Sequence, residues 1–213
     1  MKIETLRKLA GREEIDYGFI LSALKEYAKP RNKISAWLKK KELIRVKKGL
    51  YIFGEGVALE PYSKEVLANL IYGPSALSLI YALGFYGLIP ERVASVTSIT
   101  NNRYKSFSTE VGVFQYYYLN SKKYAVGVTL HQSSLQRAFL IASPEKALCD
   151  QIHITDRNIS FNHLDDIEKY LLYDLRIDEN ELRHFKLNRL DEIAHYYHDS
   201  RIHLLKKYIK MRK

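Results

Sequence analysis

Apolar residues recur at helical spacing through most of the first 40 positions of the chain. In residues 2–10, KIETLRKLA, the side chains of Ile3, Leu6 and Leu9 share one side of a helix. Gly11 follows directly and is a common stop signal for a helix. The pattern therefore predicts a short amphipathic helix at the N-terminal end.

Two further helices are predicted before residue 43. Asp16 is a candidate N-cap for YGFILSALKEYA, which has a broad apolar face. Pro30 breaks this helix and suits the first turn of the next, which runs through RNKISAWLKKKEL. In this third helix Ile34, Trp37 and Leu38 share a face at i, i+3 and i+4. We therefore expect Trp37 to lie in the core and not to stack on an unpaired base.

After Leu43 the spacing of apolar residues changes from helical to alternating. LIRV and GLYIF have the character of two short strands, and KKG between them supplies a turn in which Gly49 tolerates positive φ. Three helices followed by a two-stranded hairpin is the order of a winged helix-turn-helix domain. GEGVALEP, residues 54–61, is typical of a linker, so the first domain is expected to span residues 1–57.

Residues 58–213 mix helical and alternating patterns, which predicts a larger domain of mixed structure. SKEVLANLIY and SALSLIYALGFYGL are predicted helices. Four segments of β character follow, separated by polar turns such as NNRYKS and NSKK: RVASVTSIT, EVGVFQYYYL, YAVGVTLHQ and RAFLIA. They predict a small, mainly antiparallel sheet.

Helix-start signals mark the remainder of the chain. SPEKALCD begins with Ser143 as a cap and Pro144 at the first helical position. Capping-box spacing marks two further starts, Asn162 with Asp165 and Asp178 with Glu181. The expected fold class is α+β, with an N-terminal winged helix-turn-helix followed by a larger mixed domain that has a small antiparallel sheet and several helices.

The net charge of +10 is concentrated at the two ends of the chain. Residues 1–53 carry 14 Lys or Arg and 6 Asp or Glu, whereas residues 54–200 are mildly acidic. A basic N-terminal block indicates an anionic partner. The last 13 residues, 201–213, carry 6 Lys or Arg and no acid. They predict a basic C-terminal helix. Such a helix could bind DNA phosphates, a membrane surface or an acidic partner, or it could simply be solvated.

The composition indicates the cellular compartment in which the protein is expected. The chain has no apolar run long enough for a membrane span, and MKIETLRKLAGREE lacks the apolar region of a signal peptide. The single cysteine, Cys149, excludes an intramolecular disulfide framework and fits a reducing environment. We therefore expect a cytoplasmic protein without a membrane partner.

The third helix and the hairpin form the strongest candidate site. Arg31 and Asn32 stand near the start of the helix, where recognition helices contact bases, and they suit two-point hydrogen bonding to guanine and adenine respectively. The hairpin cations are placed for flanking phosphates or the minor groove. The expected DNA-contacting set is Arg31, Asn32, Lys33, Ser35, Lys39, Lys40, Arg45, Lys47 and Lys48. A helix with a solvated lysine face is the plain alternative.

Signals for an enzyme are weak. The nucleotide-binding and hydrolase motifs GxxxxGK[ST], GxGxxG and GxSxG do not occur. Asp150, Asp156, Asp165 and Asp166 could form the carboxylate cluster of a metal nuclease, but their spacing has no specificity. His195, His198 and His203 do not form a clear metal-binding set, and no sequence context activates Cys149 as a nucleophile. We expect no catalytic residue, no metal and no cofactor.

Three segments in order resemble the AbiEi-type antitoxins. These are the helix-turn-helix leading to KKGLYIF, then SALSLIYALGFYGLIP, then IASPEKALCD. The resemblance implies a two-domain bacterial protein encoded beside a nucleotidyltransferase-like toxin. By it, the winged helix-turn-helix would bind inverted repeats in the promoter and repress the operon. The second domain would neutralise the toxin in a type IV system, where direct toxin binding is not required. The same resemblance assigns DNA contact to the candidate set above, apart from Arg45.

Two other function classes stay open from the residues alone. The first is a metal-dependent nuclease or nucleotidyltransferase whose basic module delivers the substrate. The second is a protein-interaction module that uses its hairpin for pairing. We expect a sequence-specific repressor of double-stranded promoter DNA that also acts as an antitoxin.

Overall fold

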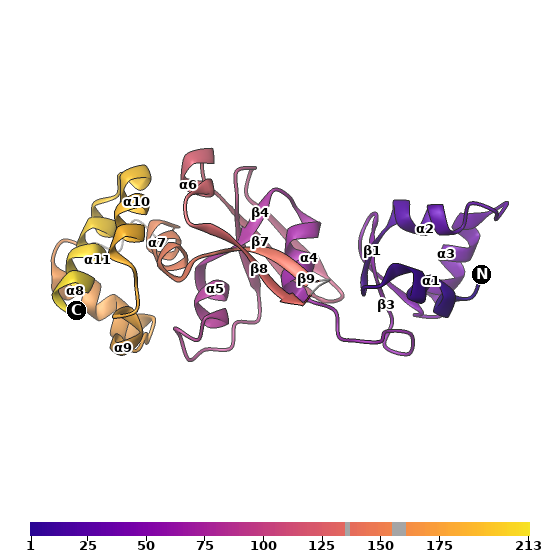
Figure 1. Ribbon diagram of the computed structural model, residues 1–213, viewed down its shortest axis with the longest axis horizontal. Coiled ribbons are helices and arrows are strands. Elements are labelled where there is room, and N and C mark those ends of the chain that lie inside the picture. The colour runs from indigo at the N-terminus through magenta and orange to yellow at the C-terminus, as the bar shows by residue number, and fades with distance from the viewer. Residues whose placement is uncertain (135–136, 155–160) are drawn as a thin grey trace.

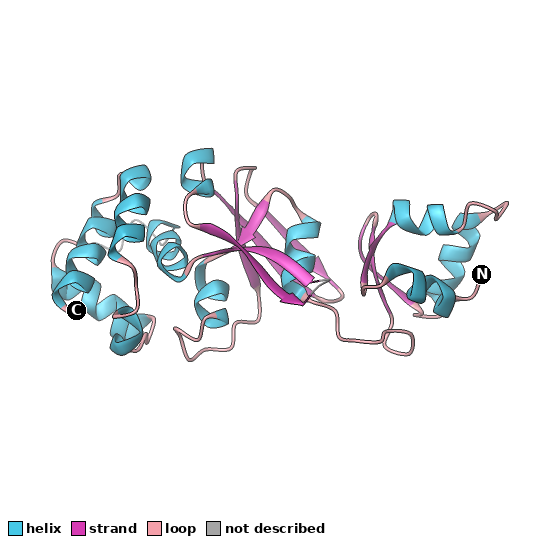
Figure 2. Ribbon diagram, viewed as in Figure 1, coloured by secondary structure: helices cyan, strands magenta, loops and turns pink. Residues whose placement is uncertain are grey.

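Helices gather at both ends of the molecule and strands lie between them (Figure 1, Figure 2). The computed structural model describes residues 1–134, 137–154 and 161–213. The chain begins at one end of the elongated molecule and finishes at the other (Figure 1). We call the part from α1 to β3 the N-terminal lobe, because its helices share their own hydrophobic cluster.

The N-terminal lobe contains the three helices and the hairpin that the sequence predicts. Gly11 takes a left-handed conformation directly after the first helix, and the side chain of Asp16 accepts a hydrogen bond from the Phe19 amide at 2.8 Å. Pro30 occupies the first turn of the third helix, as expected. The elements are α1 (Ile3–Ala10), β1 (Glu14–Asp16), α2 (Tyr17–Ala23), α3 (Pro30–Lys39), β2 (Leu43–Lys47) and β3 (Leu50–Phe53).

The strand β1 was not predicted. It adds to the hairpin and gives an antiparallel sheet of order β1-β3-β2. Side chains alternate across β3, so Tyr51 and Phe53 join the core of the N-terminal lobe while Leu50 and Ile52 join the core of the rest of the protein. All four residues of β3 are therefore buried, and this sheet lies between two apolar cores.

A six-stranded sheet of order β6-β7-β5-β4-β9-β8 forms the centre of the molecule. The prediction of a mainly antiparallel sheet is wrong in one respect, because the β4–β9 and β5–β7 pairs are parallel. The strand β4, inside the predicted helix SALSLIYALGFYGL, pairs with both β5 and β9. The elements are α4 (Lys64–Ile71), β4 (Ser75–Leu77), α5 (Leu79–Phe85), β5 (Val96–Thr100), β6 (Lys105–Thr109), β7 (Gly112–Tyr118), α6 (Ser121–Ala125), β8 (Val128–Ser134) and β9 (Arg137–Ala142).

The remaining helices pack against one another beyond the sheet (Figure 1). The Ser143 hydroxyl accepts a hydrogen bond from the Lys146 amide at 3.3 Å, which confirms the predicted cap of α7. The next predicted start is one residue too early, because Asp166, and not Asp165, accepts hydrogen bonds from backbone amides at the start of α8. The elements are α7 (Pro144–Ile154), α8 (Leu164–Lys169), the π-helix η1 (Tyr170–Asp174), α9 (Glu179–Leu182), α10 (Leu187–Tyr197) and α11 (Ser200–Met211).

Candidate nucleic-acid interface

The helix α3 has one buried face and one exposed face. Ile34 and Trp37 hold it against the N-terminal lobe, with 4% and 3% of their surfaces exposed. The outward side chains are exposed, and the helix contains no carboxylate. These exposed residues are Arg31, Asn32, Ser35, Lys39 and Lys40.

Two of the basic side chains on α3 are held by aromatic neighbours. The Lys33 ammonium lies 5.5 Å from the centroid of the Trp37 ring, a distance typical of a cation–π contact, and Lys33 is half-buried. Arg31 donates a hydrogen bond from Nε to the hydroxyl of Tyr17 at 3.3 Å. Tyr17 is also tied to the hairpin, because its amide donates to the Gly49 carbonyl at 2.9 Å. The start of α3 is thus linked through Tyr17 to the hairpin turn.

Lys47 and Lys48, both expected to reach phosphates or the minor groove, have different surroundings in the hairpin. Lys47 donates a hydrogen bond from Nζ to the carbonyl of Ile71, at the end of α4. Burial, with a smaller contribution from the nearby Lys105 ammonium, lowers the pKa of Lys47. Docking follows from the two-sided burial of β3, which draws the hairpin onto the rest of the protein. Arg45 and Lys48 remain exposed.

A second cation lies next to this docked turn. The Lys105 ammonium lies 5.4 Å from the centroid of the Tyr72 ring and 5.2 Å from that of Phe107. The Tyr72 hydroxyl donates to the carbonyl of Arg103 at 3.2 Å, and Arg103 is exposed. The electropositive surface therefore continues from the hairpin onto β6. Sequence reasoning missed Lys105 and Arg103, because only the docking of the lobe brings β6 near the hairpin.

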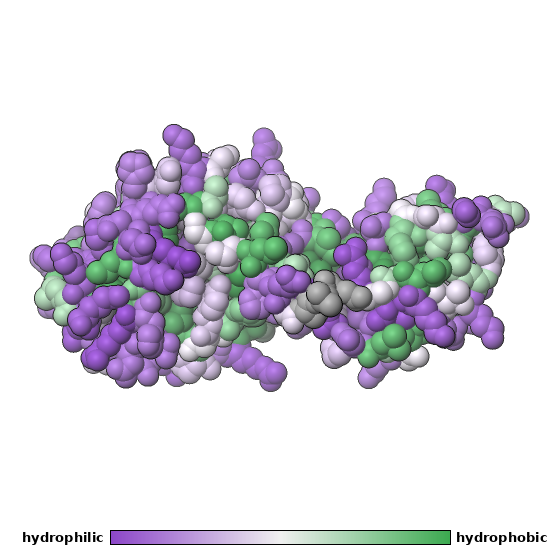
Figure 3. Space-filling view, in the orientation of Figure 1, coloured by the Kyte–Doolittle hydropathy of each residue, from purple (hydrophilic) through white to green (hydrophobic). Residues whose placement is uncertain are grey.

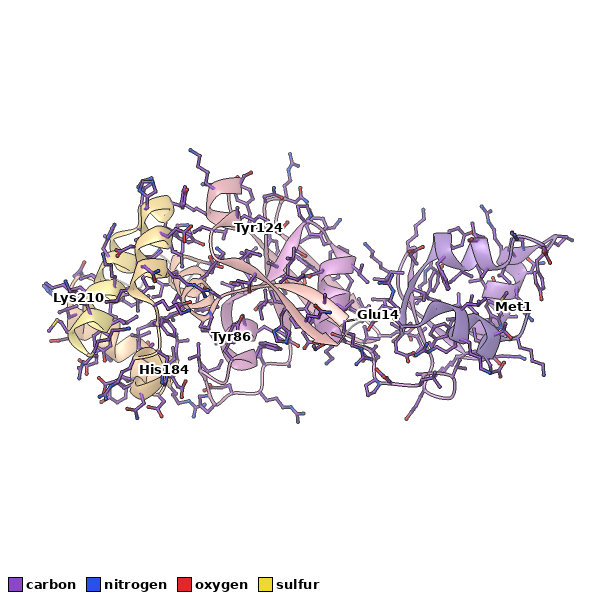
Figure 4. All side chains as sticks on the ribbon, in the orientation of Figure 1. Met1, Glu14, Tyr86, Tyr124, His184 and Lys210 are labelled. Carbon is purple, nitrogen blue, oxygen red and sulfur yellow. The ribbon has the colours of Figure 1, made fainter. Side chains whose placement is uncertain are left out.

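Two buried glutamates hold the linker against the N-terminal lobe. Glu13 pairs with Arg7, with Oε1 at 2.5 Å from the guanidinium, and the same oxygen accepts from the amides of Leu59 and Glu60 at 3.0 Å. Glu14 accepts from the amide of Ser63 at 2.7 Å and lies at the junction between the lobe and the sheet (Figure 4). Because these partly buried bonds pair linker amides with buried carboxylates, the segment after β3 is anchored to the lobe.

Asp150 lies in a fully buried polar network. The alternative hypothesis of a nuclease would depend on this residue. Its carboxylate accepts from the Ser78 hydroxyl at 2.5 Å and from the Lys146 ammonium at 3.0 Å. Tyr197 donates its hydroxyl to the same carboxylate, and burial raises the pKa of that tyrosine. Lys146 also donates to the carbonyl of Lys123 at 2.7 Å. The network joins α7 to α10 and has the contacts of a structural ion pair.

The other candidate catalytic residues are not brought to Asp150. Asp166 accepts bonds from backbone amides at the start of α8, Asp165 is exposed beside it, and Asp156 lies outside the described residues. His195, His198 and His203 are exposed. Across 1–134, 137–154 and 161–213, no group of three or more His, Cys, Asp or Glu is arranged to hold a metal ion. Cys149 is fully buried, and desolvation raises the pKa of its thiol.

Ion pairs bind several cations of the C-terminal helix α11. Arg201 pairs with Asp199 at 2.8 Å, Lys206 pairs with Asp191, and Arg212 pairs with Glu168 at 2.7 Å. His203, Lys207 and Lys210 are exposed at i, i+4 and i+7 along α11. The surface over these last helices is largely hydrophilic in the view of Figure 3. The basic tail is therefore partly accounted for by intramolecular pairing.

In the part of the chain with assigned structure, no helix is both long and apolar enough to cross a membrane. Comparison with models of known protein families and with curated proteins finds no match.

Proposed function

We propose that this protein is a sequence-specific repressor of double-stranded DNA and that α3 is its recognition helix. The observation that carries the proposal is the outer face of α3, where Arg31 and Asn32 are exposed at the start of a helix free of carboxylates. A helix enters the major groove only when its exposed groups complement base edges and phosphates. The helix α3 lies near one end of the molecule (Figure 1), and its outward side chains are exposed.

In the proposed arrangement the N-terminal lobe is a winged helix-turn-helix. The helices α2 and α3 form the helix-turn-helix pair, and the hairpin of β2 and β3 forms the wing. Arg45 and Lys48 would contact phosphates from the wing. Lys47 would not, because its ammonium is engaged by the Ile71 carbonyl. Lys105 and Arg103, beside the docked turn, extend the same positive surface.

The proposed mechanism separates positioning from reading. Cations on α3 and the wing dock on phosphates and release counterions, which supplies sequence-independent affinity. Arg31 and Asn32 then discriminate bases. The hydrogen bond from Arg31 Nε to Tyr17 leaves the remaining guanidinium N–H groups for a guanine edge. No catalysis and no cofactor take part in this mechanism.

The antitoxin part of the proposal rests on the order of motifs that resembles AbiEi-type antitoxins. We propose that the protein regulates its own operon through inverted repeats in the promoter. We further propose that it counteracts a nucleotidyltransferase-like toxin without the need for direct binding. Coexpression with the product of the neighbouring gene tests this part independently of DNA binding.

A salt titration on the chain's own upstream DNA tests the repressor directly. Asn32→Ala should relax preference at one base position, at a cost of about 1–3 kcal/mol for the preferred base. Lys40→Ala should weaken binding to every sequence and reduce the salt slope by about one unit. Fluorescence anisotropy with specific and scrambled duplexes separates the two effects.

Lys210→Ala is the matched control, because it removes an exposed lysine at the opposite end of the molecule. It should leave both affinity and salt slope unchanged. If Asn32→Ala and Lys40→Ala both bound like the wild type, the docking model would be wrong. The enzyme hypothesis would be favoured instead if the protein turned over DNA, RNA or nucleotides with Mg²⁺ and a folded Asp150→Asn variant did not.

A further inference from the structure

We propose that β8 pairs with the β8 strand of a second copy of this chain, so that the two central sheets join across a two-fold axis. The proposal concerns the outer edge of the sheet, where β8 has β9 as its only strand neighbour among the strands that the structure describes. It deepens the proposed function, because a repressor of inverted repeats needs two copies related by two-fold symmetry.

Across residues 1–134, 137–154 and 161–213, the backbone groups on the outer edge of β8 have no hydrogen-bond partner. Both the amide and the carbonyl of Leu140 bond to the side chain of Asn69, so these groups point away from β8. Leu130 lies opposite Leu140 in the ladder and must therefore direct its own amide and carbonyl outward. The hydrogen bond from the Ser143 amide to the Gly127 carbonyl at 2.8 Å agrees with this orientation. It shows that the odd-numbered residues of this segment direct their backbone groups toward β9. Val128, Leu130 and Gln132 form the open edge.

This edge lacks the usual protection against strand pairing. Exposed edge strands are normally blunted by charges, proline or short length. The sequence of β8, VTLHQSS, has seven residues and contains no Lys, Arg, Asp, Glu or Pro. The opposite edge strand, β6, is shorter, begins with Lys105 and follows exposed Arg103. The two edges of one sheet thus differ, and β8 is the one that can accept another strand.

The side chains of β8 favour a second copy over an unrelated strand. Antiparallel self-pairing about Leu130 places this residue opposite itself and Val128 opposite Gln132 of the other copy. Leu130 is 66% exposed in the single chain, and self-pairing would bury it against an identical side chain. A chain with a net charge of +10 repels its own copy, and an uncharged strand is where two copies can approach. The register that pairs outward-facing groups also keeps both copies equivalent.

Sedimentation equilibrium of the full chain tests the pairing. The wild type should sediment at twice the 24.9 kDa of one chain. Leu130→Lys, which places two ammonium groups at the axis, should weaken dimerisation at least tenfold while circular dichroism stays unchanged. Tyr173→Lys is the matched control, because Tyr173 is 74% exposed and lies outside the sheet. It should remain dimeric.

A disulfide trap tests the register without relying on affinity. Hydrogen-bonded antiparallel partners have Cα atoms about 5.5 Å apart, which suits a disulfide. Leu130→Cys should therefore cross-link two chains under mild oxidation, whereas Tyr173→Cys should not. The native Cys149 is fully buried and does not compete. Two results together overturn the proposal. The wild type would be monomeric at roughly 50 μM, far above the nanomolar range of specific DNA binding, and Leu130→Cys would form no cross-link.

DNA binding separates this inference from the proposed function. If both are right, Leu130→Lys keeps the affinity for one half-site and loses cooperativity on the inverted repeat. A wild type that dimerises through Leu130 but does not bind its upstream DNA overturns the repressor and supports the pairing. A wild type that binds each half-site independently, with no cross-link at position 130, overturns the pairing and supports the repressor.

Discussion

The surroundings of single residues separate those that could recognise DNA from those that hold the fold. Arg31 and Asn32 are exposed at the start of α3, as the apolar spacing of that helix predicts. Lys47 was assigned to the same surface, yet its ammonium bonds to the Ile71 carbonyl. The spacing of apolar residues in a helix is a local pattern that can be recognised in the sequence. The partner of Lys47, in contrast, lies 24 residues away along the chain. Contacts of that kind depend on how the parts of the protein dock.

Cys149 gives a prediction at the same scale. It is fully buried next to Asp150, and burial followed by this carboxylate raises the pKa of its thiol. Because the thiolate is the reactive form, a disulfide reagent at pH 8 should label the native protein only as fast as the chain opens. The labelling rate should rise with guanidinium in step with the loss of circular dichroism. Rapid labelling of the native chain would contradict this placement of Cys149.

Elements with local signals were predictable from the sequence, and elements that depend on distant partners were not. Gly11, Asp16, Pro30 and Ser143 mark helix ends that the structure confirms. The strands β1 and β4 were missed, because each has only three residues and shows no period. Pairing of β4 with β5 and β9 also makes the sheet mixed, a property that no local pattern encodes.

Gly54, at the end of the hairpin, provides a test at the level of elements. A Cβ there would lie 1.8 Å from the carbonyl oxygen of Lys41, which no side-chain movement relieves. Gly54→Ala should therefore lower the free energy of unfolding by about 1–3 kcal/mol, measured by guanidinium denaturation. Gly56→Ala is the control, since its Cβ meets nothing within 4 Å. Equal stability of the two variants would show that the hairpin can shift away from α3.

At the scale of the whole molecule, the linker is part of the structure and does not behave as a free tether. The Glu13 carboxylate accepts hydrogen bonds from the amides of Leu59 and Glu60 and pairs with the guanidinium of Arg7. Arg137 on β9 reaches the same segment, with a hydrogen bond to the Pro61 carbonyl at 2.6 Å and an ion pair to Glu60 at 2.9 Å. The linker is thus bonded to the N-terminal lobe through the buried Glu13 and to β9 of the central sheet through the more exposed contacts of Arg137.

Removal of the Glu13 carboxylate should release this segment. Glu13→Ala leaves the Arg7 guanidinium buried without its partner, so the free energy of unfolding should fall by about 3–5 kcal/mol. A glutamate-specific protease should then cut at Glu55 or Glu60 under conditions in which the wild type stays intact. Glu4→Ala, at an exposed glutamate on α1, serves as the control and should resist cleavage. Unchanged cleavage in Glu13→Ala would mean that other contacts hold the linker.

The two-sided burial of β3 limits how the protein can be divided. The composition of GEGVALEP suggests a cut after residue 57, but such a fragment would expose Val46, Leu50 and Ile52, which pack into the core beyond the lobe. It would also strip Glu13 of both linker amides. An isolated N-terminal fragment should therefore aggregate unless these apolar positions are made polar. Tests of the proposed DNA contacts are better made with point variants in the whole chain of 213 residues.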